Sequence, residues 1–93
     1  MAARIVENSA PLAYRKELED LVVEVIARYP HTARWTVAIV GFEFLPGFMI
    51  RIEDTLGLVG VCFEDGFSKD LRERLDVLFG DEQTAGHEKK QRE

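Results

Sequence analysis

Hydrophobic residues recur at helical spacing over the first third of the chain. Their positions are Tyr14, Leu18, Leu21, Val22, Val25, Ile26 and Tyr29. This i, i+3, i+4, i+7 spacing places them on one face of a helix. Ser9 can cap that helix, Pro11 suits its first turn, and Pro30 ends it by disfavouring helical angles at the preceding residue. The pattern therefore predicts a helix between Ser9 and Pro30.

After Arg34 the hydrophobic pattern alternates instead, as in a strand that is half buried. Three runs rich in aromatic and β-branched residues predict strands over residues 35–44, 48–53 and 58–63. Turn sequences separate them, and in the first of these we expect Pro46 to preset φ and Gly47 to take a positive φ. Short turns make both connections hairpins, so the strands are predicted to form an antiparallel meander.

A second apolar stripe at helical spacing follows the meander. Leu71, Leu75, Leu78 and Phe79 form it, and Gly80 is placed to end the helix. Residues 1–8 are a lead-in in which Ile5-Val6 would make at most a short edge strand. Residues 80–93 carry no aromatic or branched aliphatic anchor, so we expect a disordered tail. The predicted fold is a single α+β domain over residues 9–79, in the order helix, three-stranded antiparallel meander, helix, with the helices mainly on one face of the sheet.

Composition and charge narrow the classes of function. The 93 residues suit one domain, and a net charge of −5 argues against nucleic acid or an anionic membrane as the main partner, because both demand clustered Lys and Arg. No apolar run is long enough to span a bilayer, and the first residues lack the apolar stretch of a signal peptide. Cys62 is the only cysteine, which excludes an internal disulfide and fits a cytosolic protein.

The predicted strands carry more apolar side chains than one covered face requires. The middle strand alternates, with Arg51 on its polar side, but the first and third strands are apolar on both faces. We expect the core to contain Phe42, Phe44, Phe48, Ile50 and Ile52. We then expect a partner or dimer interface formed by the second face and the adjoining Tyr29. Its predicted residues are Tyr29, Trp35, Val37, Ile39, Arg51, Val59, Val61 and Phe63.

Three arrangements would hide this second face. The helices or the N-terminal residues could cover it within the monomer, a second copy could cover it in a homodimer, or a different protein could bind there. Strand register decides among them, because a one-residue change in either turn exchanges the two faces of a strand.

Residues with catalytic or ligating chemistry form no recognisable motif. His31 and Cys62 would be roughly 13–17 Å apart in a meander, too far for a nucleophile and its base, and His87 falls in the predicted tail. Glu43, Glu64 and Asp65 lie at one end of the predicted sheet, where carboxylates suit a hard cation or acid–base chemistry. Their spacing matches no metal loop, so we predict no catalytic, cofactor-binding or metal-binding residue.

The leading hypothesis is a cytosolic protein-interaction module without catalytic activity or cofactor, working as a homodimer through a sheet face. One alternative is an antagonist or immunity-type protein whose acidic strand ends, Glu43, Glu64 and Asp65, cap a basic surface of another protein. The other is a small-molecule or metal-binding domain. The helix–meander–helix order and the acidic balance loosely resemble the first part of the small dimeric secretion chaperones, which is an analogy of fold order alone.

Overall fold

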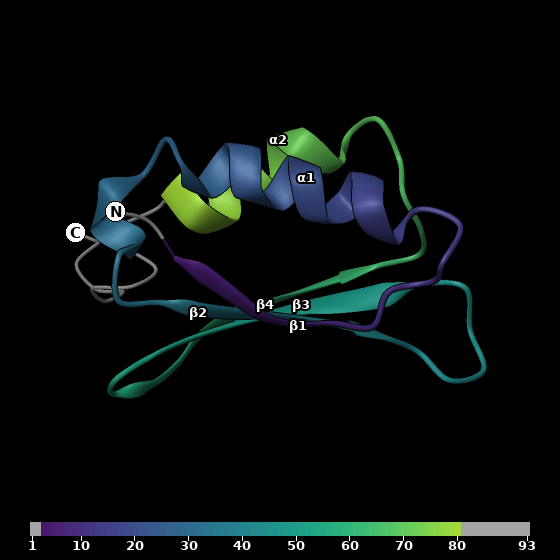
Figure 1. The fold of residues 1–93 in the computed structure, drawn as a ribbon, viewed down its shortest axis with the longest axis horizontal. Coiled ribbons are helices and arrows are strands. Elements are labelled where there is room, and N and C mark those ends of the chain that lie inside the picture. The colour runs from purple at the N-terminus through teal and green to yellow at the C-terminus, as the bar shows by residue number, and fades with distance from the viewer. Residues whose placement is uncertain (1–2, 81–93) are drawn as a thin grey trace, which may run out of the picture.

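Two helices lie over one face of a four-stranded sheet in the computed structural model, which describes residues 3–80 (Figure 1). In chain order the elements are β1 (Arg4–Asn8), α1 (Arg15–Ile26), a 3₁₀ turn (Pro30–Thr32), β2 (Thr36–Gly41), β3 (Phe48–Asp54), β4 (Gly57–Glu64) and α2 (Leu71–Gly80). The strands follow the order β1-β2-β3-β4 across the sheet. The α+β class agrees with the prediction. The part of the predicted tail from residue 81 onward lies outside the described residues.

β1 adds a fourth strand to the three-stranded sheet that the sequence predicts. It pairs in parallel with β2, whereas β2–β3 and β3–β4 are antiparallel, so the sheet is mixed and not a plain meander. The pairing is parallel because α1 returns the chain to the end at which β1 began. The Asn8 side-chain amide donates to the carbonyl of Arg15 and to the Glu19 carboxylate, which ties the end of β1 to α1.

The start of the first helix differs from the prediction. α1 begins at Arg15, and its N-cap residue, Tyr14, makes no capping hydrogen bond with its side chain. The amide of Ser9 donates to the carbonyl of Ile39, and its hydroxyl accepts from the amide of Gly41. Ser9 therefore joins β1 to β2 and does not cap the helix.

Both predicted hairpins are present, but the glycines in them act differently from the expectation. The described glycine with positive φ is Gly57, at 128°, where the β3–β4 turn closes. At Gly47 the requirement is space, since an added Cβ would overlap the carbonyl oxygen of Glu64. The expected positive φ at Gly47 is therefore wrong, and its small size lets the β2–β3 loop rest against the end of β4.

Side chains from both helices and from one face of the sheet form the core. The fully buried contributors include Leu18, Val22 and Val25 of α1, Leu71, Leu75 and Phe79 of α2, and Val37, Ile39, Phe48, Ile50 and Ile52 of the sheet. Because directly opposite residues in an antiparallel pair share a face, the register settles which side of β2 is inside. Val37 is opposite Ile52 and Ile39 is opposite Ile50, so the odd-numbered side of β2 faces the helices.

This register corrects the predicted faces of the first strand. Trp35, Val37 and Ile39, expected on the second face, are core residues. Phe42 and Phe44, expected in the core, lie beyond the end of β2, and Phe44 is 88% exposed. The cause is the length of the loop between Gly41 and Phe48, which sets the register and exchanges the sides of the strand.

Polar contacts join α2 to α1 and to the residues that follow α1. The Arg28 guanidinium is 3.3 Å from the Asp76 carboxylate, and the Tyr29 hydroxyl donates to the same carboxylate at 2.9 Å. Arg72 pairs with Glu24 at 2.6 Å. Tyr29 therefore belongs to the helix layer and not to the second face of the sheet. No helix within residues 3–80 has the length and hydropathy needed to cross a membrane.

Candidate functional site: the open side of the sheet

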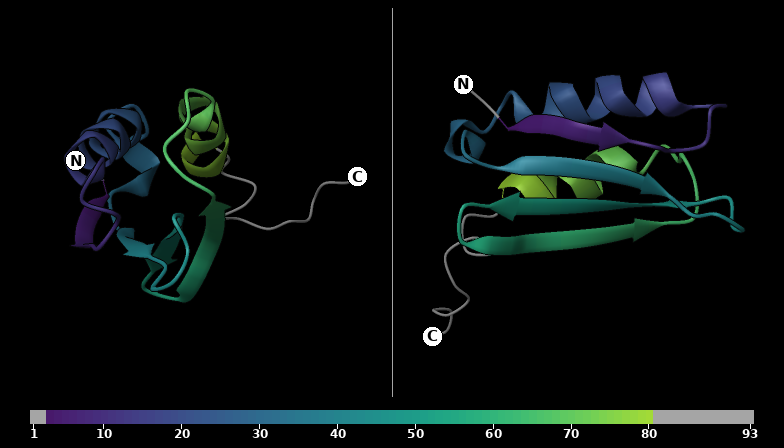
Figure 2. Two further views of the ribbon diagram at one scale, coloured as in Figure 1. Left: turned by 90° about the vertical axis from the view of Figure 1, so that its right-hand side faces the viewer. Right: turned by 60° about the horizontal axis from the view of Figure 1, so that its bottom comes forward.

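The sheet face opposite the helices is uncovered within the described part of the chain (Figures 1 and 2). We call this surface the open face. From the register, the side chains that point there include Thr36, Ala38 and Val40 of β2, Met49, Arg51 and Glu53 of β3, and Leu58, Val61 and Phe63 of β4. Its composition is mixed, with apolar side chains around one central ion pair.

The predicted interface residues divide between the two faces. Arg51, Val61 and Phe63 lie on the open face. Val59 does not, because it is the extra residue of a bulge and packs against the core. Together with the buried Trp35, Val37 and Ile39 and with Tyr29, this leaves three of the eight predicted interface residues, Arg51, Val61 and Phe63, on the open face.

A shallow hollow on the open face lies between β1 and the ion pair of β3. Arg51 and Glu53 lie two residues apart on β3 and pair at 2.8 Å, with about half of each side chain exposed. The hollow, about 240 Å³, is lined by Val6, Glu7, Thr36, Ala38, Arg51 and Glu53. It forms because Thr36 and Ala38 are small and their neighbours on β1 and β3 are large.

An aromatic pair occupies the opposite end of the open face. The rings of Phe42 and Phe63 stack with centroids 6.4 Å apart and planes 19° from parallel. Phe63 remains 68% exposed. Large aromatic side chains carry much of the energy of protein interfaces, so an aromatic pair with one ring exposed on an uncovered sheet face is the type of feature that binds protein.

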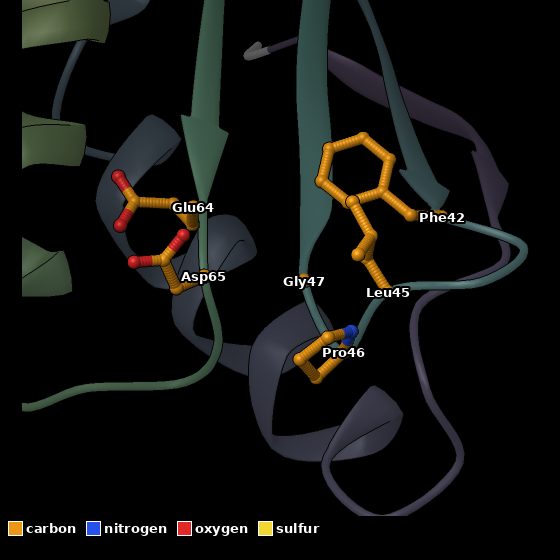
Figure 3. A pocket seen from close by; sticks show the side chains of 6 residues that line it. All are labelled: Phe42, Leu45, Pro46, Gly47, Glu64 and Asp65. Carbon is orange, nitrogen blue, oxygen red and sulfur yellow. The ribbon is translucent and has the colours of Figure 1, made fainter.

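The strand ends beside this pair enclose a small pocket (Figure 3). It measures about 150 Å³ and is lined by Phe42, Leu45, Pro46, Gly47, Glu64 and Asp65. Glu64 and Asp65 thus lie beside the end of the first predicted strand, as the sequence predicts. Both carboxylates, however, point away from Phe42 and Leu45 in Figure 3, so the pocket itself is apolar.

The Glu64 carboxylate is bound by Arg74 of α2. The guanidinium donates from Nε to Oε2 and from Nη2 to Oε1, each at 2.7 Å, and the Cys62 thiol donates to Oε2 at 3.0 Å. The hydrogen bonds from Arg74 hold the pKa of Glu64 below its usual value. Burial, aided by the bond to Glu64, raises the pKa of the Cys62 thiol to about 12.

These contacts distinguish one paired carboxylate from the other two carboxylates at the acidic strand end. Glu64 is neutralised by a partner ten residues along the chain, while Glu43 and Asp65 are exposed and form no ion pair with residues 3–80. The same part of the chain contains no group of three His, Cys, Asp or Glu side chains arranged to hold a metal ion.

Comparison with family models, with curated proteins and with solved structures gives no match.

Proposed function

We propose that this chain is a cytosolic protein-interaction module without catalytic activity, which acts as a homodimer joined through the open side of its sheet. The open side means the open face together with the outer edge of β4. The observation that carries the proposal is the uncovered sheet face with exposed apolar side chains, above all Phe63 and Leu58, which are 68% and 59% exposed.

The size of the open face supports this use. With strands about 4.8 Å apart and a rise of about 3.3 Å per residue, four strands six residues deep present roughly 400 Å². Its apolar part, which includes Leu58 and Phe63, is an exposed patch of the kind that often marks an interaction site on soluble proteins. Two-fold homodimers are the commonest oligomers of soluble proteins, and a dimer joined through the open side brings the apolar side chains of two copies together.

The state of Cys62 supports a non-catalytic role. A thiol with a pKa of about 12 is protonated at neutral pH, and the thiolate is the nucleophile in cysteine chemistry. Its hydrogen-bond partner is the carboxylate of Glu64, which accepts the thiol proton in a hydrogen bond and is itself held by Arg74.

The proposal is tested with two substitutions of equal exposure. Phe63 on the open side and Val77 on the outer surface of α2 are each 68% exposed. Phe63→Asp should weaken the dimer at least tenfold, because a carboxylate would have to be desolvated in the contact. Val77→Asp should leave association unchanged.

Sedimentation velocity from 1 to about 100 μM measures the effect, and circular dichroism shows that both variants remain folded. A wild-type chain that stays monomeric across this range contradicts the proposed homodimer.

The alternative, a protein that caps a basic surface with its acidic strand ends, remains a prediction. Arg74 neutralises Glu64, which leaves Glu43 and Asp65 as the exposed acids of that patch. No feature of residues 3–80 favours a metal or small-molecule site over the open side.

A further inference from the structure

The two edges of the sheet differ in how they resist pairing with another strand. β1 has five residues, a bulge between Ile5 and Glu7, and charged Arg4 and Glu7. Short length, bulges and charges are the devices by which edge strands avoid association. β4 has eight residues and carries no Lys, Arg or Pro; its one charged residue, Glu64, is bound to Arg74.

The outer edge of β4 offers backbone groups that the described chain does not use. β4 pairs with β3 on one side and ends the sheet on the other (Figure 2). Alternate N–H and C=O groups of an edge strand point outward. Eight residues make an edge about 27 Å long. An edge of this kind recognises one chemical partner, which is another extended strand.

A single bulge interrupts β4 and sets the direction of its side chains. Ile52 is opposite Gly60 and Glu53 is opposite Leu58, so Val59 is the extra residue. As a result the side chains of Leu58, Val61 and Phe63 all point to the open face, and the side chain of Cys62 points to the helix side.

This arrangement makes β4 complementary to itself. In an antiparallel pair with the two-fold axis at Val61, Val61 lies opposite its own copy and Gly60 lies opposite Cys62 of the second copy. With Val59 bulged out, Leu58 lies opposite Phe63 of the second copy and Gly57 lies opposite Glu64. Each opposed pair shares a face, as antiparallel pairing requires, and apolar residues meet apolar residues or glycine. The two Glu64 carboxylates lie at opposite ends of the pair, where they do not repel.

We infer that the occupant of the β4 edge is a second copy of this chain, joined by antiparallel β4–β4 pairing into one eight-stranded sheet. The inference rests on the proposed homodimer and names its contact. The open faces of the two copies become one continuous surface, and a ladder of Leu58, Val61 and Phe63 side chains runs across the axis.

Disulfide trapping tests this contact directly. Cα atoms of directly opposed antiparallel residues are about 4.5–5.5 Å apart, within the range of a disulfide. The variant Val61→Cys with Cys62→Ser should therefore form a covalent dimer under mild oxidation, at least tenfold faster than the matched control Ala38→Cys with Cys62→Ser. Ala38 lies in the middle of the open face on β2, two strands from the edge.

The outcomes separate the contact from the homodimer itself. Sedimentation of the wild type reports whether copies associate, and non-reducing electrophoresis reports where. Association with faster cross-linking at residue 38, or with none at residue 61, overturns β4 pairing and leaves the homodimer standing. A monomeric wild type overturns both.

Hydrogen exchange on the unmodified chain is an independent measurement of the same contact. We expect alternate amides of β4 to gain protection as protein concentration rises through the dimerisation range. Protection of β4 that does not change with concentration, in a chain that dimerises, would overturn the edge contact even if a cysteine variant failed to fold.

Discussion

At the scale of single residues, Glu64 shows how a charge is retained in a small core. Glu64 is the last residue of β4 and is only 8% exposed. Burying a carboxylate is costly unless a hydrogen-bond donor compensates its charge. Arg74 supplies two hydrogen bonds from α2, and in doing so holds the sheet end to the helix. Because the Arg74 guanidinium is half exposed, the pair does not require the burial of a second charge.

The lowered pKa of Glu64 makes stability depend on pH in a stated direction. A carboxyl whose folded pKa lies below its unfolded value of 4.5 stabilises the fold fully above that pH. The contribution is lost as the pH falls through the lower folded value. Glu64→Gln should cost about 1–2 kcal/mol at pH 7, at or below the lower end of the range for charged hydrogen bonds, because solvent screens the exposed side of Arg74.

Urea unfolding of the wild type and of Glu64→Gln between pH 2.5 and 7 measures this contribution. The gap between the two free energies should be constant above about pH 5 and close at the acid end. Glu43→Gln, on the neighbouring loop, is the control and should leave the curve unchanged. A gap that persists undiminished at pH 2.5 would mean that the carboxylate is not what stabilises the wild type.

At the scale of elements, glycines that look equivalent in the sequence have distinct structural roles. Gly57 has room for a side chain but a φ of 128°, Gly47 has no room beside Glu64, and Gly66 has neither constraint. The turn sequences mark where the chain reverses. They do not show whether a glycine is needed for its backbone angle or for its size.

Gly57→Ala and Gly66→Ala isolate the cost of the backbone angle. No heavy atom lies within 4 Å of an added Cβ at either position, so packing does not differ. We expect Gly57→Ala to destabilise the fold by about 1–3 kcal/mol, because L residues rarely adopt such an angle. Gly66→Ala should be neutral or slightly stabilising, measured by thermal unfolding. Equal melting temperatures would show that the β3–β4 turn relaxes without cost.

The helices illustrate the limit of local prediction for elements. The apolar stripe of α1 identified Leu18, Val22, Val25 and Ile26, all of which are buried. The start of the helix was missed, because Ser9 bonds to residues of β2 that are 30 and 32 positions away. Helix capping is predicted from nearby residues, whereas Ser9 makes its hydrogen bonds with residues that are distant in the sequence.

At the scale of the whole molecule, one loop length decides which side of β2 is the interior. Val37 and Ala38 are neighbours with similar surroundings in sequence, yet Val37 lies in the core and Ala38 on the open face opposite Arg51. The core therefore uses Trp35, Val37 and Ile39, and the open face of β2 uses Thr36, Ala38 and Val40.

Val37→Asp and Ala38→Asp test this assignment of faces. Val37→Asp places an unpaired charge among fully buried side chains and should abolish folding, seen as loss of near-ultraviolet circular dichroism. Ala38→Asp places the same charge beside Arg51 and should leave the monomer folded. If the two results were exchanged, the register of β2 against β3 would be shifted by one residue.

The sequence by itself determined the α+β class, the apolar helix faces, both hairpins and the possibility of an edge strand at Ile5-Val6. These follow from periodicity and turn chemistry, which act over a few neighbouring residues. Tertiary structure alone decided the inner side of β2, the parallel pairing of β1, the pairing of Glu64 with Arg74 and the free edge at β4. Each of these depends on register or on contacts between distant segments, and a side-chain period of two leaves both faces of a doubly apolar strand equally eligible for the core.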